Sequence, residues 1–351
     1  IEADTLAGLV RSHRSSGAAA TVLTAEMVDP TGYGRVVRGP QGGVCKIVEQ
    51  KDASPEEKRI REINTGIYCF EVAGLFEALS LVAPINVQGE YYLTDIIEMY
   101  VKEGRAVGAV LLKDSTEVTG INDRVQLAEV EQIMRRRLLR DLMKSGVTVV
   151  DPASTFVGRK VRVGRDTIIH PFTLIEGSTV IGEDCVIGPG SRLSNTTVGS
   201  GVTVQNSIVL DSLIGDNCNI GPFSYLRPET RLGNGVKVGD FVEIKKSLLG
   251  AGSKVPHLSY VGDATLGEKV NIGAGTITCN YDGYKKSPTY IGDEAFIGSN
   301  TNLVAPVEIG ARAVTGAGST ITRNVPSDAL AVERANQNVL PGWAARKKEK
   351  K

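Results

Sequence analysis

The feature that most constrains the fold is a six-residue interval between aliphatic residues, which runs from Val157 to Ile321. Each aliphatic residue precedes Gly or another small or polar residue, and a small or β-branched residue follows four positions after it. One short strand and one corner explain both positions, because the aliphatic side chain fills an interior and the small one fits beside a turn. Three such units make a triangular coil, and stacked coils bury a continuous core. The interval therefore predicts a parallel β-solenoid.

The interval has identifiable irregularities. An irregular stretch follows Leu193, and single-residue slips begin after Ile244. The segment TCNYDGYKKSPTY (278–290) interrupts the array, and its turn formers and lysines predict a protruding loop. The interior positions are Val157, Val163, Ile169, Ile175, Ile181, Ile187, Leu193, Ile214, Ile220, Leu226, Leu232, Val238, Ile244, Leu249, Val255, Val261, Leu266, Ile272, Ile291, Ile297, Leu303, Ile309, Thr315 and Ile321.

The composition fits an aliphatic core with many tight turns, because 40 glycines accompany only seven Phe, ten Tyr and one Trp in a chain that is 41% hydrophobic. Lys and Arg total 40, as do Asp and Glu, and this balance argues against nonspecific binding of nucleic acid or anionic membranes. The five cysteines stand singly without a C-x-x-C pair. No apolar run reaches the roughly 18 residues of a membrane span, and no signal-peptide pattern opens the chain. We therefore expect a cytoplasmic protein.

The residues before the array predict two further elements. Residues 123–144 have helical apolar spacing, with Asp123 and Gly146 placed as caps, and suggest a linker helix. The residues before it alternate strand-like and helical runs, which predicts an α/β unit, and that unit looks incomplete. The strand-like runs are 18–27, 42–50, 63–72 and 106–112, and the helical runs are 4–17 and 89–104.

Several motifs match one family. They are TGYGRVVR (31–38), KIVEQKDAS (46–54), EINTGIY (62–68), QGEYYLTDII (88–97), GINDR (120–124), FVEIKK (241–246), HLSYVGDATLG (257–267) and NIGAGTITCNYDGYKK (271–286). Together with the array, they closely resemble the bacterial bifunctional N-acetylglucosamine-1-phosphate uridyltransferase / glucosamine-1-phosphate N-acetyltransferase over essentially the whole chain. The domains that the resemblance implies are a partial Rossmann-like nucleotidyltransferase (uridyltransferase) domain at 1–121, the linker helix at 122–146, a left-handed β-helix acetyltransferase domain at 147–332 and a C-terminal tail at 333–351.

The resemblance also implies an activity. Acetyl would pass from acetyl-CoA to the amine of glucosamine-1-phosphate, giving N-acetylglucosamine-1-phosphate. The intact family member also transfers UMP from UTP, giving UDP-N-acetylglucosamine for peptidoglycan and lipopolysaccharide synthesis. The expected assembly is a homotrimer with acetyl-CoA between neighbouring solenoids.

The uridyltransferase half departs from the family pattern. Neither the family's L-x-A-G-x-G-T-R-M segment nor its magnesium-binding Asp is found in this sequence. The positions that match nucleotide-sugar contacts are Gly34, Glu49, Asn64 and Asn122, and Asn122 also matches a magnesium ligand. Because Mg²⁺ is held by few protein carboxylates plus substrate phosphates, we expect weak binding and no useful uridyl transfer by this chain.

An N-acetyltransferase needs a base, cations for the sugar phosphate and donors for the thioester oxyanion. His257 stands two residues after the interior Val255 and should project outward. It matches the family's base, a role that suits an imidazole, and Glu243 is a candidate to orient it and stabilise its charged form. Arg227 and Lys245 replace small residues 18 positions apart, one full coil, and should stack as a phosphate clamp.

The remaining site residues come from the resemblance alone. Tyr260 and Asn271 match sugar contacts, and Lys286 matches a phosphate or sugar contact. Asn280 and Tyr281 are expected beside the reacting carbonyl. The positions that match acetyl-CoA contacts are Ala274, Asn280, Tyr281, Ser299, Ala317 and Arg334.

Other functions compete with this interpretation. If the array carries no chemistry, two alternatives remain. The chain is then either a nucleotidyltransferase whose array serves only for oligomerisation, or an inactive fragment. A hexapeptide-repeat zinc carbonic anhydrase needs three histidine ligands, and the array offers only His170 and His257.

Overall fold

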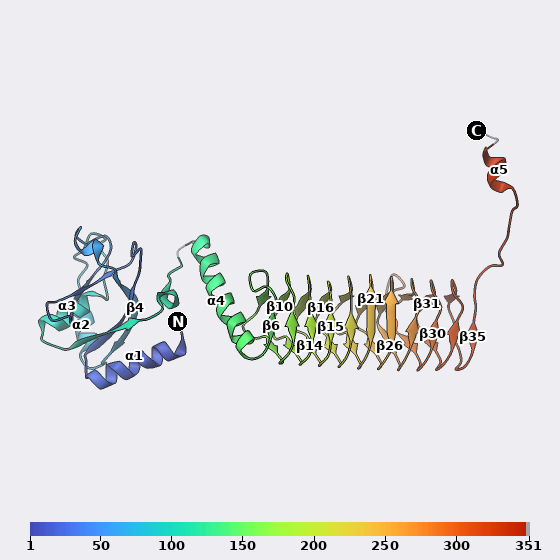
Figure 1. Cartoon of the computed structure of the whole chain (residues 1–351), viewed down its shortest axis with the longest axis horizontal. Coiled ribbons are helices and arrows are strands. Elements are labelled where there is room, and N and C mark those ends of the chain that lie inside the picture. Colours follow the sequence, from blue (N-terminus) through green and yellow to red (C-terminus); the bar gives the residue numbers. More distant parts are fainter. Residues whose placement is uncertain (122, 349–351) are drawn as a thin grey trace. The chain divides into compact units, whose positions relative to one another are not determined.

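The structure, a computed structural model, describes residues 1–121 and 123–348. The chain divides into two compact units, Ile1–Ile133 and Met134–Lys351, and the division falls inside helix α4 (Arg124–Lys144). Figure 1 shows a single sheet with its helices in the first unit and a long stack of coils in the second. In the described part of the chain, no helix is long and apolar enough to cross a membrane.

The first unit is an α/β domain on one mixed sheet of strand order β3-β2-β4-β1-β5. β1 runs parallel to β5 and antiparallel to β4. The predicted strands and helices are all present, and the structure adds two short elements, β2 and α2. The strands are β1 Ala20–Glu26, β2 Arg35–Arg38, β3 Val44–Val48, β4 Glu62–Phe70 and β5 Val107–Leu112; the helices are α1 Ala3–Ser16, α2 Leu75–Leu81 and α3 Asp95–Lys102, with 3₁₀ turns η1 Glu57–Arg59 and η2 Ser115–Val118.

Helix α4 has the caps that its sequence predicts. The Gln126 backbone N–H donates to the Asp123 carboxylate at 2.8 Å, which satisfies one of the free donors of the first turn. Gly146 follows the last turn with φ of 101°, a conformation that suits glycine.

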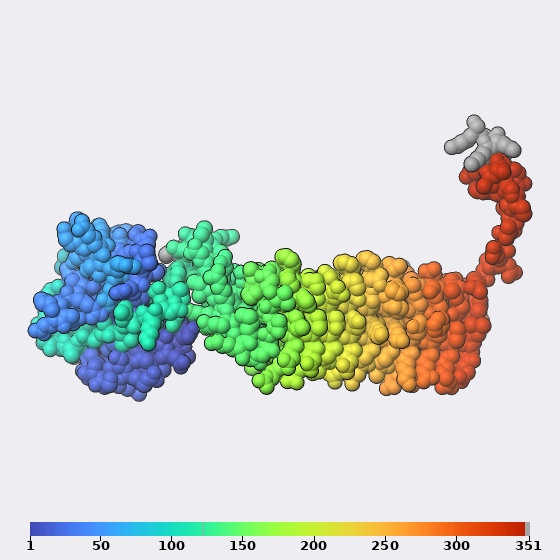
Figure 2. Space-filling view, in the orientation of Figure 1, coloured from blue at the N-terminus to red at the C-terminus, as the bar shows by residue number. Residues whose placement is uncertain are grey.

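The second unit is a left-handed parallel β-helix of three sheets, ended by the short helix α5 (Trp343–Lys348). Figure 2 shows its coils stacked in sequence order. Face 1 comprises β7 Phe156–Val157, β10 Leu174–Glu176, β13 Arg192–Ser194, β16 Ile208–Leu210, β19 Tyr225–Leu226, β22 Glu243–Lys245, β25 Tyr260–Gly262, β28 Ile277–Cys279, β31 Asn302–Val304 and β34 Thr320–Ile321. Face 2 comprises β8 Arg162–Val163, β11 Val180–Ile181, β14 Thr197–Val198, β17 Leu213–Ile214, β20 Arg231–Leu232, β23 Leu248–Leu249, β26 Ala264–Leu266, β29 Thr289–Ile291 and β32 Val307–Ile309. Face 3 comprises β6 Thr148–Val149, β9 Ile168–Ile169, β12 Val186–Ile187, β15 Thr203–Val204, β18 Asn219–Ile220, β21 Lys237–Asp240, β24 Lys254–His257, β27 Asn271–Ile272, β30 Phe296–Ile297, β33 Val314–Thr315 and β35 Leu330–Ala331.

The array continues through the stretch that the sequence marks as irregular. Val198, Val204 and Val209 occupy the interior there and are buried in the same core as their neighbours. Leu193 pairs with Val209, so this coil is two residues shorter than an 18-residue coil. The irregularity is therefore the replacement of two six-residue units by five-residue units, and the core is uninterrupted.

The glycines that follow interior aliphatic residues lie so close to the adjacent coil that most have no room for a side chain. A Cβ on Gly250 would lie 2.4 Å from the backbone of Gly267, and one on Gly182 would lie 2.6 Å from the carbonyl of Gly199. The left-handed corner positions are instead held largely by other residues, such as Asp184 and Asn217. The sequence links these glycines to turns, whereas the structure shows that they leave room for the adjacent coil.

We expect Gly250→Ala to destabilise the solenoid by about 2 kcal/mol, because the new methyl group forces two hydrogen-bonded coils apart. Gly158→Ala is the matched control, since its nearest added contact is 3.5 Å and its φ is ordinary. Melting followed by circular dichroism should show a lower transition temperature for the solenoid in the first variant only. Equal melting temperatures for both variants would contradict this account of the glycines.

Candidate active site

His257 lies at the end of face 3, where the chain turns towards face 1; we call this turn the 3–1 corner. Its Nδ1 lies 2.7 Å from Oδ1 of Asp240, which ends the neighbouring strand β21. The Leu258 N–H donates to the Asp240 carbonyl at 3.0 Å, so the backbone fixes this register. The His257 hydrogen bond holds the pKa of the Asp240 carboxyl below its usual range. The sequence analysis missed Asp240.

The sequence analysis expects Glu243 to orient His257, but in the structure Glu243 bonds to Arg227 instead. One carboxylate oxygen of Glu243 accepts a hydrogen bond from Arg227 Nη1 at 2.8 Å across face 1. This bond raises the pKa of the Arg227 guanidinium. Glu243 and His257 are separated because they lie on different faces of the solenoid, on strands β22 and β24.

Arg227 and Lys245 follow the paired interior residues Leu226 and Ile244 of β19 and β22, as their spacing predicts. They therefore occupy equivalent positions in adjacent coils, where the chain turns from face 1 to face 2; we call this turn the 1–2 corner. Lys245 Nζ lies 3.1 Å from Oδ2 of Asp263, and both side chains are largely buried. This pairing places a fixed ammonium at the edge of face 1.

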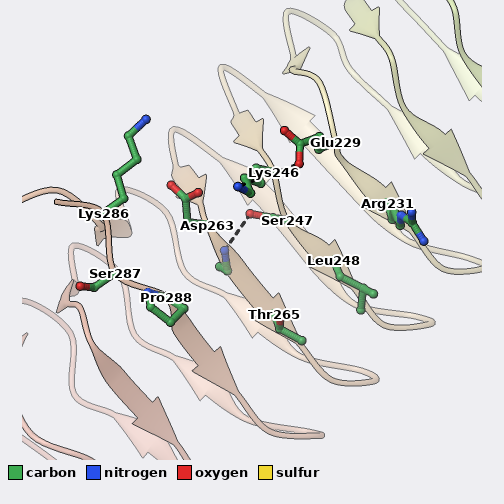
Figure 3. Close-up of a pocket in the computed structure, with 11 residues that line it drawn as sticks. Glu229, Arg231, Lys246, Ser247, Leu248, Asp263, Thr265, Lys286, Ser287 and Pro288 are labelled. Atoms are coloured by element: carbon green, nitrogen blue, oxygen red, sulfur yellow. Dashed lines mark hydrogen bonds and ion pairs between the residues drawn. The ribbon is translucent and has the colours of Figure 1, made fainter.

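Asp263 also organises the loop that follows β28. Its Oδ2 accepts a hydrogen bond from the Asn280 amide, whose nitrogen is 3.5 Å from the Tyr260 hydroxyl. Lys286 lies near Lys245, which lowers the pKa of the Lys286 ammonium. A groove of about 510 Å³ runs along this corner, and Figure 3 shows Lys286, Asp263 and Lys246 among its lining residues. Cations thus gather at the 1–2 corner.

A column of small residues continues from His257 along the 3–1 corner. The Gly275 N–H donates to the His257 carbonyl at 3.4 Å. In the next two coils, Asn300 N–H donates to Ala274 and Gly318 N–H donates to Ser299, at 2.7 and 2.8 Å. The last step is a bond from Arg334 Nη1 to the Ala317 carbonyl at 2.9 Å. The structure thus places four of the positions matched to acetyl-CoA in successive coils of one column that begins at His257: Ala274, Ser299, Ala317 and Arg334.

The other matched positions lie elsewhere in the chain. Asn280 belongs to the 1–2 corner, and Tyr281 is exposed, with its hydroxyl bonded to the Gly283 carbonyl at 2.6 Å. Asn271 begins β27 on face 3 and pairs with Lys254. The sequence analysis groups Asn280 and Tyr281 with the acetyl-CoA positions, but the width of face 1 separates them from that column in one chain.

The first unit keeps three of its matched residues together. An added Cβ on Gly34 would lie 3.2 Å from the Glu49 carboxylate, and the Asn64 N–H donates to the Gly34 carbonyl at 2.8 Å. Burial raises the pKa of the Glu49 carboxyl. Asn122 lies outside the described residues. Among residues 1–121 and 123–348, no three His, Cys, Asp or Glu side chains converge on a possible metal position.

The Lys245–Asp263 pair should make stability depend on pH. Burial alone would raise the pKa of Asp263, but bonds from Lys245 and Asn280 outweigh it and hold this pKa below its usual range. As pH falls, Asp263 therefore takes up its proton in the unfolded chain before it does so in the folded protein. The contribution of the Lys245–Asp263 pair to the free energy of unfolding is then lost as pH falls to the folded-state pKa of Asp263. We expect Asp263→Asn to lower the melting temperature at pH 7 and to approach wild type in acid.

The matched control for this prediction is Asp328→Asn. Its pair with Arg312 is exposed on both sides, at 57% and 60%, and should contribute little. A melting difference between wild type and Asp263→Asn that stays constant down to strongly acidic pH would contradict the predicted linkage.

Comparison with known proteins agrees with this two-part architecture. A nucleotidyl transferase model matches residues 1–126, a bacterial transferase hexapeptide model matches residues 288–323, and a model of the GMPPB C-terminal domain matches residues 154–230. The bifunctional protein GlmU of Pelotomaculum thermopropionicum is 73% identical over 351 residues, which are 100% of this chain and 77% of that protein. The chain belongs to the bifunctional GlmU family.

A second relative, the GlmU protein of Heliobacterium modesticaldum, is 59% identical over 98% of this chain and 75% of its own length. The matches place a nucleotidyl transferase domain and hexapeptide transferase repeats in one chain, as the resemblance implies. Among solved structures, the UDP-N-acetylglucosamine acyltransferase of Francisella novicida has 16% identity and a TM-score of 0.30, covering 53% of this chain and 67% of that one. That similarity is too low to support an inference about function.

Proposed function

We propose that this member of the GlmU family transfers acetyl from acetyl-CoA to the amine of glucosamine-1-phosphate. The observation that carries the proposal is the position of His257, where the small-residue column meets face 1. The column offers a track of small residues for the thioester arm, and the opposite edge of face 1 presents Arg227 and Lys245. A phosphorylated amino sugar between the two has its phosphate at the cations and its amine towards the imidazole.

The proposed chemistry uses each group in one role. His257 takes a proton from the sugar ammonium, so that the amine lone pair can attack the thioester carbonyl. Arg227 and Lys245 hold the phosphate through charge-assisted hydrogen bonds. The carbonyl oxygen becomes an oxyanion, for which the Asn280 amide is the proposed donor.

We also propose that the active unit is a homotrimer. In one chain, Asn280 and Tyr281 lie at the 1–2 corner, whereas Ala274, Ser299 and Ala317 follow the 3–1 corner. A loop from a neighbouring solenoid placed along the 3–1 corner brings the two sets together around acetyl-CoA. The cysteines of the described chain are all unpaired, which supports a cytoplasmic location.

The test is release of free CoA thiol from acetyl-CoA, with glucosamine-1-phosphate compared with unphosphorylated glucosamine. We expect release with the phosphorylated sugar and much less with glucosamine at the same concentration. No release with either sugar would overturn the proposal and favour a nucleotidyltransferase whose solenoid serves only for oligomerisation, or an inactive fragment.

We further propose that a chain of these 351 residues, which contain no match to the family's glycine-rich phosphate segment, transfers no uridyl group. The sequence has no match to the family's magnesium-binding Asp, which supports the proposal because the metal would neutralise the nucleotide phosphates. We expect no pyrophosphate release from UTP and N-acetylglucosamine-1-phosphate in the presence of Mg²⁺. Measurable release by the purified chain would contradict this prediction.

A further inference from the structure

The His257–Asp240 contact has the geometry of an oriented base. Both residues end face 3 strands, β24 and β21, and they are register partners in adjacent coils. The 2.7 Å contact uses Nδ1 of the imidazole, which leaves Nε2 without a partner among the described residues. A carboxylate can only accept a hydrogen bond, so Nδ1 must carry the proton and Nε2 must carry the lone pair.

Of the charged groups around His257, Asp240 is the one that bonds to the imidazole. Glu243 on β22 is bonded to Arg227, and Tyr260 lies on β25 of the adjoining face. Lys237 and Lys254 are register partners at the other ends of β21 and β24, away from His257. On the far side, β27 consists of Asn271 and Ile272 and presents no ionisable group. Asp240 is therefore the acid that bonds to the imidazole within the described part of the chain.

We propose that Asp240 is the positioning residue for acetyl transfer: it fixes the Nδ1–H tautomer of His257 and stabilises the imidazolium that forms during the reaction. This inference rests on the proposed acetyltransferase function. Nε2 accepts the proton of the sugar ammonium, the amine forms a C–N bond with the thioester carbon, and the C–S bond breaks. The departing thiolate then takes this proton from Nε2, which restores the neutral base for the next cycle, and the nitrogen loses its second proton to solvent as the amide forms.

The kinetic test compares Asp240→Leu and Asp240→Asn with wild type. Leu removes the acceptor, and we expect kcat for thiol release to fall about 10- to 100-fold, with the KM values of both substrates changed less than about twofold. Asn keeps an amide oxygen that can accept from Nδ1–H but removes the charge, so its kcat should lie between the other two. Glu268→Leu removes an exposed carboxylate from the next coil and should retain wild-type kcat.

Two kinetic results would overturn the inference. One is a kcat of Asp240→Leu within twofold of wild type. The other is an equal loss of kcat in Asp240→Leu and Glu268→Leu, which would mean that removing either carboxylate disturbs the solenoid alone.

A second readout is independent of activity. Nitrogen-15 NMR of the histidine side chains, assigned with His257→Ala, reports which ring nitrogen is protonated in the neutral imidazole. We expect the Nδ1–H form in wild type and a shift towards Nε2–H in Asp240→Leu. An Nε2–H form in wild type would overturn the inference even if the protein releases thiol. An Nδ1–H form would support the dyad even if the thiol assay defeats the proposed substrate.

Discussion

Replacing His257 with Ala should lower kcat for thiol release by about 10³-fold, within the range that general-base catalysis contributes. KM for glucosamine-1-phosphate should change little, because the proposed phosphate contacts, Arg227 and Lys245, are at the opposite edge of face 1. The measurement is steady-state release of CoA with both substrates varied in turn.

The control is His170→Ala, since His170 directly follows a face 3 strand, β9, in an early coil and lies away from the cations. Its kcat should equal that of wild type. A His257→Ala enzyme with more than a tenth of wild-type kcat would assign the base to another group. Water or a substrate oxygen would then be the candidate proton acceptor.

Replacing Lys245 with Met should raise KM for glucosamine-1-phosphate by about 10- to 100-fold. A hydrogen bond between charged groups contributes about 1.5–3 kcal/mol. The proposed bond to the sugar phosphate comes from the Lys245 ammonium, which is largely buried. The rate with unphosphorylated glucosamine should stay the same, so the preference for the phosphorylated sugar should shrink by the same factor. KM for acetyl-CoA should not change.

Arg312→Met is the control for the loss of a cation, because Arg312 forms an exposed pair with Asp328 in a later coil. Melting curves separate lost binding from lost stability, since Lys245 also neutralises Asp263. Equal losses of activity with the phosphorylated and unphosphorylated sugars would show that Lys245 supports the fold and does not read the phosphate.

Much of the solenoid could be predicted because its period converts sequence distance into spatial adjacency. Arg227 and Lys245 are 18 positions apart and occupy equivalent positions in adjacent coils. The same logic missed Asp240, because the coil between Asp240 and His257 contains a five-residue unit and is 17 residues long. An 18-residue step back from His257 falls on Gly239, so no acid was expected there.

Other parts of the site could not be predicted from a period. The loop after β28 has no repeat, so the bond between Asn280 and Asp263 was not expected. In the first unit, β2 has four residues and α2 has seven, too few for a clear pattern. β2 and α2 form where they do because of the sheet and helices that they pack against, and a local sequence pattern does not contain these tertiary contacts.

Because the coils are stacked, the arrangement of the site does not depend on the number of coils that precede it. In the described solenoid, the strand pairings join each coil to the one before and the one after it. Arg227, His257 and the loop before β29 lie within a few consecutive coils. The coils that precede Arg227 set only the distance between this site and α4. Insertion or deletion of whole coils before Arg227 should therefore leave the contacts among the site residues unchanged.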